Sequence, residues 1–312
     1  MKKFRFLLLA LSVATIMTNC KKDEQPEQTA SDNYSSLAQF YSEKAPKMQY
    51  YTINAITGGT FTTPQGTVVN IPANAFKTKM DNTVSGDVTI EFKDIYKKSD
   101  MLLANVPTVT LWGAPIKSGG EFFIKAVQNN ESLKIASGKK IEVIQPLNGM
   151  AADSGMLPMI LAQDTAAWSG WEVTGADTVI ITATNYIFNL YQFNTPIDSG
   201  SWCNSDNPTF FNNYQQTTLT LNPLDDLESY HPDVFLVFKD INCMVHLYRS
   251  TTAFPYYYAP IGLECTAVAL GVKDGKLYSA FVPITISSNK IVNFKLEETT
   301  SDEFTNKLDN LN

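Results

Sequence analysis

Residues 58–76 read GGTFTTPQGTVVNIPANAF, and in this stretch turns and short alternating strands follow one another in a definite order. The Gly58-Gly59 pair permits positive φ or a close approach of another backbone, and the proline and glycine of residues 64–66 close a turn. Every second side chain of residues 67–71 then lies on the same side, as in a strand with one covered face. Pro72 ends that strand, so the stretch predicts the beginning of a sheet.

The same succession of turns and short alternating strands continues over the next seventy residues. A turn at residues 85–87 precedes residues 88–92, where Val, Ile and Phe alternate with polar side chains on a predicted strand. Residues 117–120 predict another turn that leads into a strand at residues 121–125. Residues 138–143 predict one more turn and strand.

These residues resemble a known family. The Gly58-Gly59 start, the Ile-Pro-x-x-Ala turn at residues 71–75 and the Gly-Asp-Val-Thr opening at residues 86–89 are similar to the ZU-five domain. This is the β-sandwich domain of ankyrins, netrin receptors and zonula occludens proteins. The resemblance implies a β-sandwich over residues 49–148. Asn74 stands where the family commonly has glycine, and asparagine tolerates the left-handed conformation that such a turn needs.

Some members of that family cut themselves at a His-Phe-Ser sequence, which this chain lacks. Its two histidines, His231 and His246, are followed by Pro232 and Leu247. Self-cleavage by that route is therefore not expected.

Residues 149–298 predict a second β-sandwich. An Asp-Gly pair in residues 273–276 is the favoured centre of a two-residue hairpin. No long amphipathic helix separates the expected strands, which is typical of antiparallel sandwiches. These strands are Thr178 to Phe193, Thr217 to Leu221, Val234 to Lys239, Met244 to Arg249, Leu263 to Val272, Lys276 to Ile286 and Ile291 to Leu296.

The segment 299–312 predicts a short C-terminal helix. Thr300 and Glu303 have the spacing of a capping box, and Phe304, Leu308 and Leu311 fall on one helical face. The predicted fold class is therefore all-β, with two consecutive antiparallel β-sandwich domains and a short C-terminal helix.

The N-terminal residues predict export. Residues 1–5 carry three cationic side chains, and the apolar run of residues 6–17 is too short to cross a bilayer, so residues 1–19 are expected to be a signal peptide. The segment ending at Cys20 resembles the lipobox of bacterial lipoproteins, in which this cysteine becomes the lipidated first residue. Asn19 departs from the small residue that is usual there, so ordinary secretion remains an alternative. Residues 20–48 are polar and predict a lipidated, flexible tether.

Lys21-Lys22-Asp23-Glu24 follows the candidate lipobox directly. It resembles the signal that sends lipoproteins of Bacteroidetes-type bacteria to the outer face of the outer membrane. The expected partner is thus a membrane, reached through the lipid, and the expected location is the cell surface. The periplasmic face of the membrane is the alternative location.

The charge balance excludes one class of partner. The formal net charge is −7, and loss of Lys2, Lys3 and Arg5 with the signal peptide would give −7 − 3 = −10. Arg249 would then be the only arginine. A chain of this kind has little affinity for phosphate backbones, so nucleic acid is not an expected partner.

If Cys20 carries lipid, Cys203, Cys243 and Cys265 remain, and at most one disulfide can form among them. The sequence leaves that pairing open. If residues 241–248 form a strand, Cys243 and His246 lie on opposite faces and cannot form a catalytic pair.

Two aromatic segments are candidates for binding a glycan or a protein. Tyrosine and tryptophan rings stack on apolar faces while neighbouring amide and carboxylate groups form hydrogen bonds. Both segments are expected to be loops at the end of a sandwich. The candidate residues are Trp202, Phe210, Phe211, Tyr214, Tyr256, Tyr257 and Tyr258.

The acidic segment 225–233 is a weaker candidate for a metal site. Its carboxylates and imidazole suit a divalent ion, but the segment lacks the oxygen spacing and glycine of a defined calcium loop. The candidates are Asp225, Asp226, Glu228, His231 and Asp233.

Three functions remain open. The first is a non-enzymatic surface lipoprotein that serves in binding, adhesion or envelope scaffolding, without a cofactor. The second is a carbohydrate-capture lipoprotein that uses the aromatic segments. The third is a glycan hydrolase with a carboxylate pair, because two acids brought together by folding leave no spacing signature. Other hydrolase, phosphate-binding and dinucleotide-binding motifs do not occur in the sequence.

Overall fold

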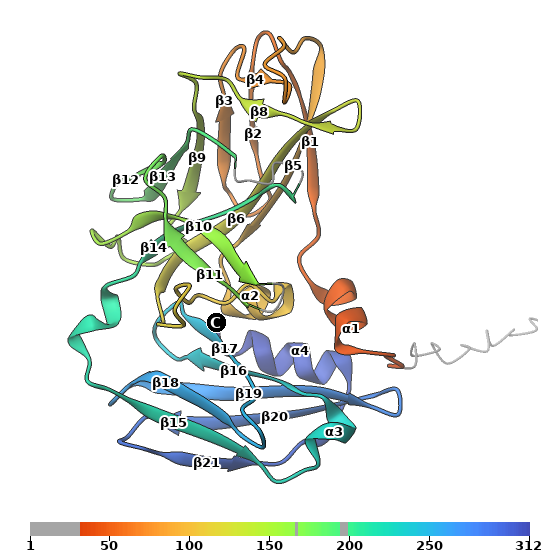
Figure 1. Cartoon of the computed structure of the whole chain (residues 1–312), viewed down its shortest axis with the longest axis vertical. Coiled ribbons are helices and arrows are strands. Elements are labelled where there is room, and N and C mark those ends of the chain that lie inside the picture. The colour runs from red at the N-terminus through yellow and green to blue at the C-terminus, as the bar shows by residue number, and fades with distance from the viewer. Residues whose placement is uncertain (1–31, 166–167, 194–198) are drawn as a thin grey trace, which may run out of the picture. The chain divides into compact units, whose positions relative to one another are not determined.

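The computed structural model describes residues 32–165, 168–193 and 199–312, which build one compact unit. Strands dominate this unit, and the predicted all-β class with two sandwiches is confirmed (Figure 1). The described residues do not include the predicted signal peptide, Cys20 or the first part of the predicted tether. Within the described ranges no helix is long and apolar enough to cross a membrane.

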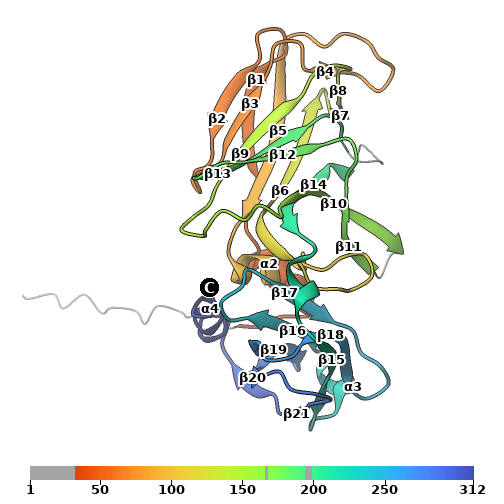
Figure 2. The same ribbon diagram turned by 90° about the vertical axis from the view of Figure 1, so that its left-hand side faces the viewer.

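The first sandwich packs a seven-stranded sheet against a five-stranded one. The larger sheet has the order β1 (Gln49–Asn54), β5 (Asp87–Ile95), β6 (Lys117–Gln128), β14 (Ser201–Asn207), β10 (Leu157–Thr165) and β11 (Trp168–Val173), with β7 (Glu131–Ser132) beside β6. The smaller sheet has the order β12 (Thr178–Ile181), β13 (Asn185–Leu190), β9 (Ile141–Pro146), β3 (Val68–Ile71) and β2 (Gly59–Thr62). A separate pair, β4 (Phe76–Lys77) and β8 (Lys134–Ile135), lies beside them (Figure 2).

The alternation predicted for β3 and β5 builds the core of this sandwich. Val69 and Ile71 on β3 are buried against Val88, Ile90 and Phe92 on β5. The turn after β3 also follows the prediction, because Asn74 has a φ of 55°.

The predicted boundary at residues 148/149 does not match the strand pairing. β10, β11, β13 and β14 all follow that boundary in sequence, yet they pair within the sheets of the first sandwich. The first sandwich therefore extends to Asn207.

The second sandwich starts with β15 (Gln216–Pro223), which lies between β18 (Phe254–Pro260) and β21 (Ile291–Phe294) in a three-stranded sheet. The pairing of β15 with β21 is parallel, and the other strand pairs of this sandwich are antiparallel. The second sheet has the order β17 (Met244–Leu247), β16 (Asp233–Phe238), β19 (Glu264–Lys273), β20 (Lys276–Thr285) and β22 (Glu297–Thr299).

The predicted hairpin joins β19 to β20. Lys273 pairs with Lys276, and Asp274 and Gly275 have φ values of 50° and 81°. Positive φ at both central residues is what a tight two-residue hairpin requires.

The five-stranded sheet of the second sandwich is covered on both faces. One face packs on the three-stranded sheet, and the other lies against α1 (Leu37–Lys44), α2 (Lys98–Ala104) and α4 (Ser301–Asp309). The capping box at Thr300 and Glu303 is present, and Phe304 and Leu308 are fully buried. The C-terminal helix predicted from the sequence is thus confirmed.

The prediction of a flexible tether as far as residue 48 is wrong for its second part. Tyr34 and Phe40 are buried, and the Asp32 carboxylate accepts a hydrogen bond from the Ser301 backbone N–H at 2.6 Å. Phe40 contacts Phe304 edge to face, with ring centroids 5.7 Å apart. The apolar side chains of residues 34–41 place this segment in the core of the folded unit.

Candidate functional site

The aromatic candidates lie on strands more than on loops. Trp202 belongs to β14, and Tyr256, Tyr257 and Tyr258 belong to β18. The prediction of two aromatic loops is therefore wrong for these residues. Of the seven candidates, only Phe210 and Phe211, in the 3₁₀ turn of residues 210–213, and Tyr214, directly after it, lie outside the strands.

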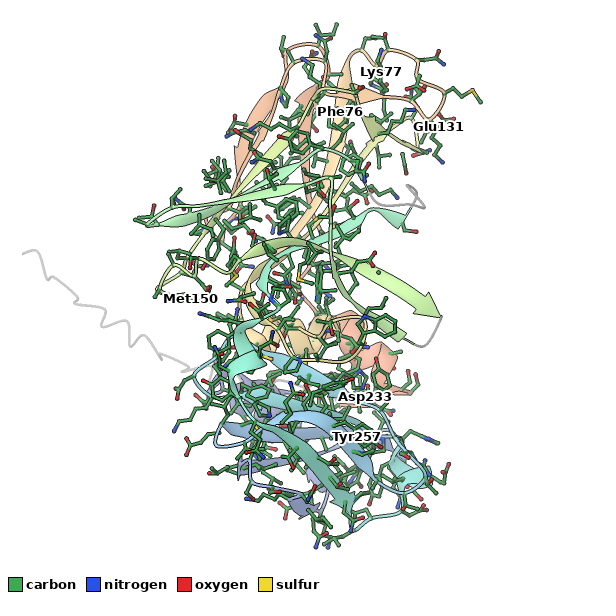
Figure 3. All side chains as sticks on the ribbon, turned by 60° about the vertical axis from the view of Figure 1, so that its left-hand side comes forward. Phe76, Lys77, Glu131, Met150, Asp233 and Tyr257 are labelled. Carbon is green, nitrogen blue, oxygen red and sulfur yellow. The ribbon has the colours of Figure 1, made fainter. Side chains whose placement is uncertain are left out.

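Most of these rings serve packing. Phe211 and Tyr256 are 2% and 6% exposed in the core of the second sandwich, and Phe210, Tyr214 and Tyr258 pack against that core. Trp202 belongs to other clusters, beside Phe123 at 5.6 Å between ring centroids. Tyr257 alone of the seven is largely open to solvent, with 64% exposure (Figure 3). The seven rings therefore do not form one exposed face for stacking on a sugar.

The first acidic candidates serve local structure. An Asp225 carboxylate oxygen accepts the backbone N–H of Leu296 at 2.7 Å. Asp226 caps the short helix α3 (Leu227–Tyr230) by accepting the N–H of Glu228 at 3.1 Å. Asp225 thus fixes the backbone at Leu296, and Asp226 stabilises the start of α3.

The remaining acidic candidates also have separate partners. Glu228 forms an ion pair with Arg249 at 2.7 Å, His231 ends α3 with a φ of 42°, and Asp233 accepts the hydroxyl of Tyr41 at 3.0 Å. In the described part of the chain, no three or more His, Cys, Asp or Glu side chains are grouped to hold a metal. The acidic segment therefore does not assemble the metal site for which it was a candidate.

The three described cysteines are free and buried. Burial raises the pKa of the Cys203 thiol well above its usual range, and it raises the pKa values of Cys243 and Cys265 to about 12. Cys243 lies in the core of the second sandwich, whereas His246, on the other face of β17, stacks on Phe235 at 4.6 Å between centroids. These thiols are neither paired nor placed as nucleophiles.

A different region has the properties of a binding site. A cavity of about 720 Å³ lies where the end of β5, the start of α2 and the loop after β9 meet the residues that follow β16. We call it the Lys97 pocket. Met150, labelled in Figure 3, lies in the loop after β9 and is one of the residues that line the pocket. Four lysines line it, namely Lys97, Lys98, Lys117 and Lys239.

Lys98 is the buried lysine of this pocket. Its Nζ donates hydrogen bonds to the carbonyl oxygens of Phe238 and Lys239 at 2.6 and 2.9 Å. Burial lowers the pKa of Lys98, while nearby Cys243 and Asp240 oppose that effect. Lys98 therefore fixes the first turn of α2 to the end of β16.

Two other lysines are paired with carboxylates. Lys117 forms an ion pair with Asp153 at 2.9 Å, and Lys239 forms one with Glu264 at 2.6 Å. Burial acts to raise the pKa of Asp153, but hydrogen bonds from Lys117 and from the Gly155 backbone outweigh it and hold that pKa below its usual range.

Lys97 is exposed and lies at the N-cap position of α2, and it makes none of the ion pairs or hydrogen bonds described for the other three lysines. Asp240 is the only acidic side chain in the lining. The lining itself holds four lysines and one carboxylate, while Asp153, Glu264 and Asp100 lie outside it and interact with Lys117, Lys239 and Lys97. Positive side chains thus outnumber negative ones in the lining, in a chain whose net charge is −7.

The rest of the lining suits a polar organic molecule. The side-chain nitrogens of Gln65 and Asn242 already donate to the Asp94 and Ser118 carbonyls at 2.7 and 3.1 Å, which leaves their amide oxygens as acceptors. Asn148 adds a third amide, and Tyr96 and Ile241 add apolar surface. A cavity of this volume falls within the range of small-molecule sites. The arrangement can bind an organic anion of moderate size.

No family model matches this chain. No curated protein matches it either. The interpretation of the site therefore depends on its own geometry.

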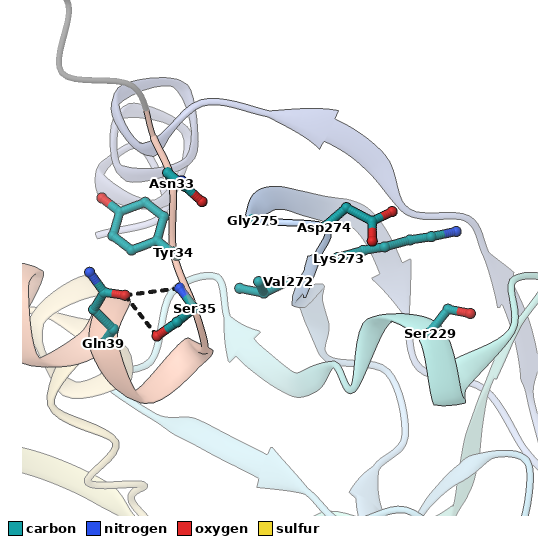
Figure 4. Close-up of a pocket in the computed structure, with 9 residues that line it drawn as sticks. All are labelled: Asn33, Tyr34, Ser35, Gln39, Ser229, Val272, Lys273, Asp274 and Gly275. Carbon is teal, nitrogen blue, oxygen red and sulfur yellow. Dashed lines mark hydrogen bonds between the residues drawn. The ribbon is translucent and has the colours of Figure 1, made fainter.

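A second cavity, of about 560 Å³, lies between residues 33–39 and the hairpin of β19 and β20 (Figure 4). The Tyr34 N–H donates to the Gly275 carbonyl at 2.9 Å there. Gly275 has a φ of 81°, which other residues rarely adopt, and a Cβ there would lie 2.2 Å from the Asn33 side-chain oxygen, so a larger residue would require Asn33 to move. This close packing indicates that the cavity lies at the contact between the N-terminal segment and the hairpin. The lining of this second cavity is polar and contains one lysine and one aspartate, so it lacks the excess of lysines found in the Lys97 pocket.

Sequence reasoning missed the Lys97 pocket because its lysines are spread from residue 97 to residue 239. They share no spacing, and each belongs to a segment that looks like an ordinary solvated strand end or turn. Only the adjacent pair Lys97-Lys98, five residues after the predicted strand at residues 88–92, gives a local signal, and such pairs are common on protein surfaces.

Proposed function

We propose that the chain is a non-enzymatic lipoprotein, anchored through Cys20 in a bacterial outer membrane and exposed at the cell surface, and that it binds a small organic anion in the Lys97 pocket. The pocket is the observation that carries the binding part of this proposal. The anchoring part depends on the sequence around Cys20, and the ZU-five-like character of the first sandwich remains a prediction.

Two observations support Cys20 as the lipidated residue. It follows a cationic and then apolar leader and precedes the Lys-Lys-Asp-Glu run. Cys203, Cys243 and Cys265 are buried inside the folded unit and cannot receive a lipid without unfolding.

The charge and the lining support an anion as ligand. Lys97 provides an ammonium group at the mouth of the pocket, and the amides can bind hydroxyl groups of the same molecule. An acidic saccharide, with a carboxylate and several hydroxyls, has this combination. The ligand would thus be a carbohydrate, as in the capture hypothesis, but bound by lysines and amides in place of the aromatic segments.

The carboxylate-pair hydrolase receives no support from the pair that the structure shows. Glu121 on β6 and Asp206 on β14 interact electrostatically, but both are fully buried. A glycan cannot reach them in this conformation.

Replacing Cys20 by alanine is expected to abolish incorporation of radioactive palmitate and to release the protein from the membrane fraction, since no other described thiol is accessible. Labelling of cells that express the Cys20→Ala variant measures this directly. Cys265→Ala is the matched control and should remain labelled. Equal labelling of Cys20→Ala and the unaltered protein would contradict the anchoring proposal.

Lys97→Ala is expected to weaken binding of an acidic oligosaccharide about 10-fold, because one charge-assisted hydrogen bond is lost. Titration calorimetry with tetragalacturonate, with uncharged galactotetraose as the neutral comparison, measures this effect. Lys139→Ala, outside the pocket, should leave affinity unchanged.

The binding should also weaken as salt is raised, because Lys97 is exposed. Equal affinity for acidic and neutral oligomers, or equal affinity of Lys97→Ala and the unaltered protein, would overturn the anion-binding part. Absence of turnover products in the same samples is expected of a binding protein. The palmitate experiment tests the anchoring part separately.

A further inference from the structure

Four polar side chains form a patch on adjacent strands of the first sandwich and are completely shielded from solvent. These are Ser118 and Glu121 on β6, and Asn204 and Asp206 on β14, each with 0% exposure. We call them the buried polar patch. Two carboxyl groups in such a position require a physical explanation, because charged groups are rarely fully buried without partners.

The strand register brings the four side chains to one face. Glu121 lies opposite Asn204, and Ser118 lies opposite Asp206, so that Gly119 and Gly120 together occupy the place of one residue. This β-bulge allows Ser118 and Glu121 to point the same way, although three positions separate them. The Ser118 hydroxyl accordingly donates to the Asn204 side-chain oxygen at 3.0 Å.

The bulge requires its two glycines. A Cβ on Gly119 would lie 2.6 Å from the Tyr186 ring, and one on Gly120 would lie 2.5 Å from the Tyr96 ring. The turn predicted from the sequence at residues 117–120 does not form, because β6 continues through these residues. The pair keeps the strand intact and aims the polar side chains outward from the sandwich core.

Most of the polar atoms of the patch have no partner. Both carboxylate oxygens of Glu121, both of Asp206 and the side-chain nitrogen of Asn204 make no hydrogen bond to the protein. They account for most of the buried unpartnered side-chain atoms in the described part of the chain. Leaving such groups unpaired costs several kcal/mol each, so something must satisfy them.

The patch is closed by the segment before β6 and by residues next to β17. The Ser118 backbone N–H donates to the Asn242 carbonyl at 2.8 Å, and the Asn242 side chain donates to the Ser118 carbonyl at 3.1 Å. The Thr108 N–H donates to the Met244 carbonyl at 2.8 Å. The Cys243 thiol donates a hydrogen bond to the Thr108 carbonyl at 3.9 Å, so it does not act as a donor to the carboxylates of the patch.

We infer that the buried polar patch binds a calcium ion, with Glu121 and Asp206 as carboxylate ligands and Asn204 and Ser118 as neutral oxygen ligands. Two carboxylates balance the charge of a divalent ion. Calcium accepts carboxylate, amide and hydroxyl oxygens in irregular geometry, and backbone carbonyls or water complete its six to eight ligands. The absence of imidazole from these four residues favours such a hard ion over zinc or copper.

The electrostatics agree with this assignment. Burial, together with the charge of Asp206, raises the pKa of Glu121 well above its usual range, and burial raises the pKa of Asp206 well above its usual range. A calcium ion bound by both side chains would offset the cost of burying two unpartnered carboxylates.

Thermal unfolding of the full chain tests the inference. After treatment with EDTA, addition of calcium at 100 times its dissociation constant is expected to raise Tm by about 5 °C or more. Glu121→Gln and Asp206→Asn should abolish that response. Glu131→Gln, which changes an exposed side chain of β7, is the matched control and should keep the response.

Terbium luminescence provides a readout that does not need the variants to fold equally well. Trp202 lies two residues before Asn204 on β14, so excitation of tryptophan should sensitise a terbium ion in the patch. Calcium should compete this signal away, and Trp202→Phe should reduce it without removing the calcium-dependent rise in Tm.

Two results would overturn the inference. One is a Tm that calcium leaves unchanged while Glu121→Gln raises it at neutral pH, which would show a protonated pair. The other is a response to magnesium or manganese without a response to calcium.

Discussion

Replacing Phe304 by alanine is expected to destabilise the folded unit by about 3–5 kcal/mol, because a fully buried aromatic ring is lost and a cavity remains. The ring contacts Phe40 of α1 and Phe281 of β20, with centroid distances of 5.7 and 5.5 Å. Its removal therefore weakens both helices against the sheet. Urea unfolding followed by tryptophan fluorescence measures the change.

Asn306→Ala is the matched control for this prediction. Asn306 lies on the exposed side of the same helix, and alanine is a better helix former, so stability should change by less than about 0.5 kcal/mol. If Phe304→Ala were as stable as Asn306→Ala, the C-terminal helix would not be part of the core.

Replacing Lys98 by methionine is expected to destabilise the chain by about 1–3 kcal/mol, because the carbonyls of Phe238 and Lys239 lose a charged donor. Methionine keeps most of the volume, so loss of hydrogen bonding dominates over loss of packing. The desolvation cost of the buried ammonium, which lowers its pKa, is relieved at the same time and keeps the net effect moderate.

Lys97→Met separates stability from binding at the adjacent position. Lys97 is exposed, so its replacement should leave the urea midpoint nearly unchanged while it weakens anion binding. The same unfolding experiment on both variants checks this contrast. Equal destabilisation by the two substitutions would show that the Lys98 hydrogen bonds do not matter for stability.

The sequence predicts well those elements whose signals are local. The hairpin at Asp274-Gly275 and the capping box at Thr300 depend on conformational preferences of a few adjacent residues, and both occur in the structure. The alternation in residues 88–92 likewise places three side chains in the first core. Such patterns do not need knowledge of the partner strand.

Features that depend on distant pairing could not be predicted in this way. Nothing in residues 201–207 shows that this strand pairs with β6, more than seventy residues earlier, so the boundary between the sandwiches was misplaced. The carboxyl group of Glu121 likewise looks like the polar side of an amphipathic strand. Its burial follows only from the segments that close over β6.

The aromatic binding residues were predicted wrongly for a related reason, which is that the sequence does not show which side chains other segments cover. Trp202 and Tyr256 are the kinds of residue that bind sugars, but the same rings are also favoured in cores, and burial decides between the two uses. The sequence shows the residue types without showing which face of the strand is covered.

The contact between Phe40 and Phe304 has a consequence for biosynthesis. The two rings join the N-terminal helix α1 to the C-terminal helix α4. The hydrogen bond from Ser301 to Asp32 likewise joins residues that are 269 positions apart in the sequence. During synthesis the segment of α1 is made early and lacks its partner Phe304 until α4 has been made. The part of the five-stranded sheet that α4 covers therefore stays exposed until late in synthesis, when a protease or chaperone can still bind it.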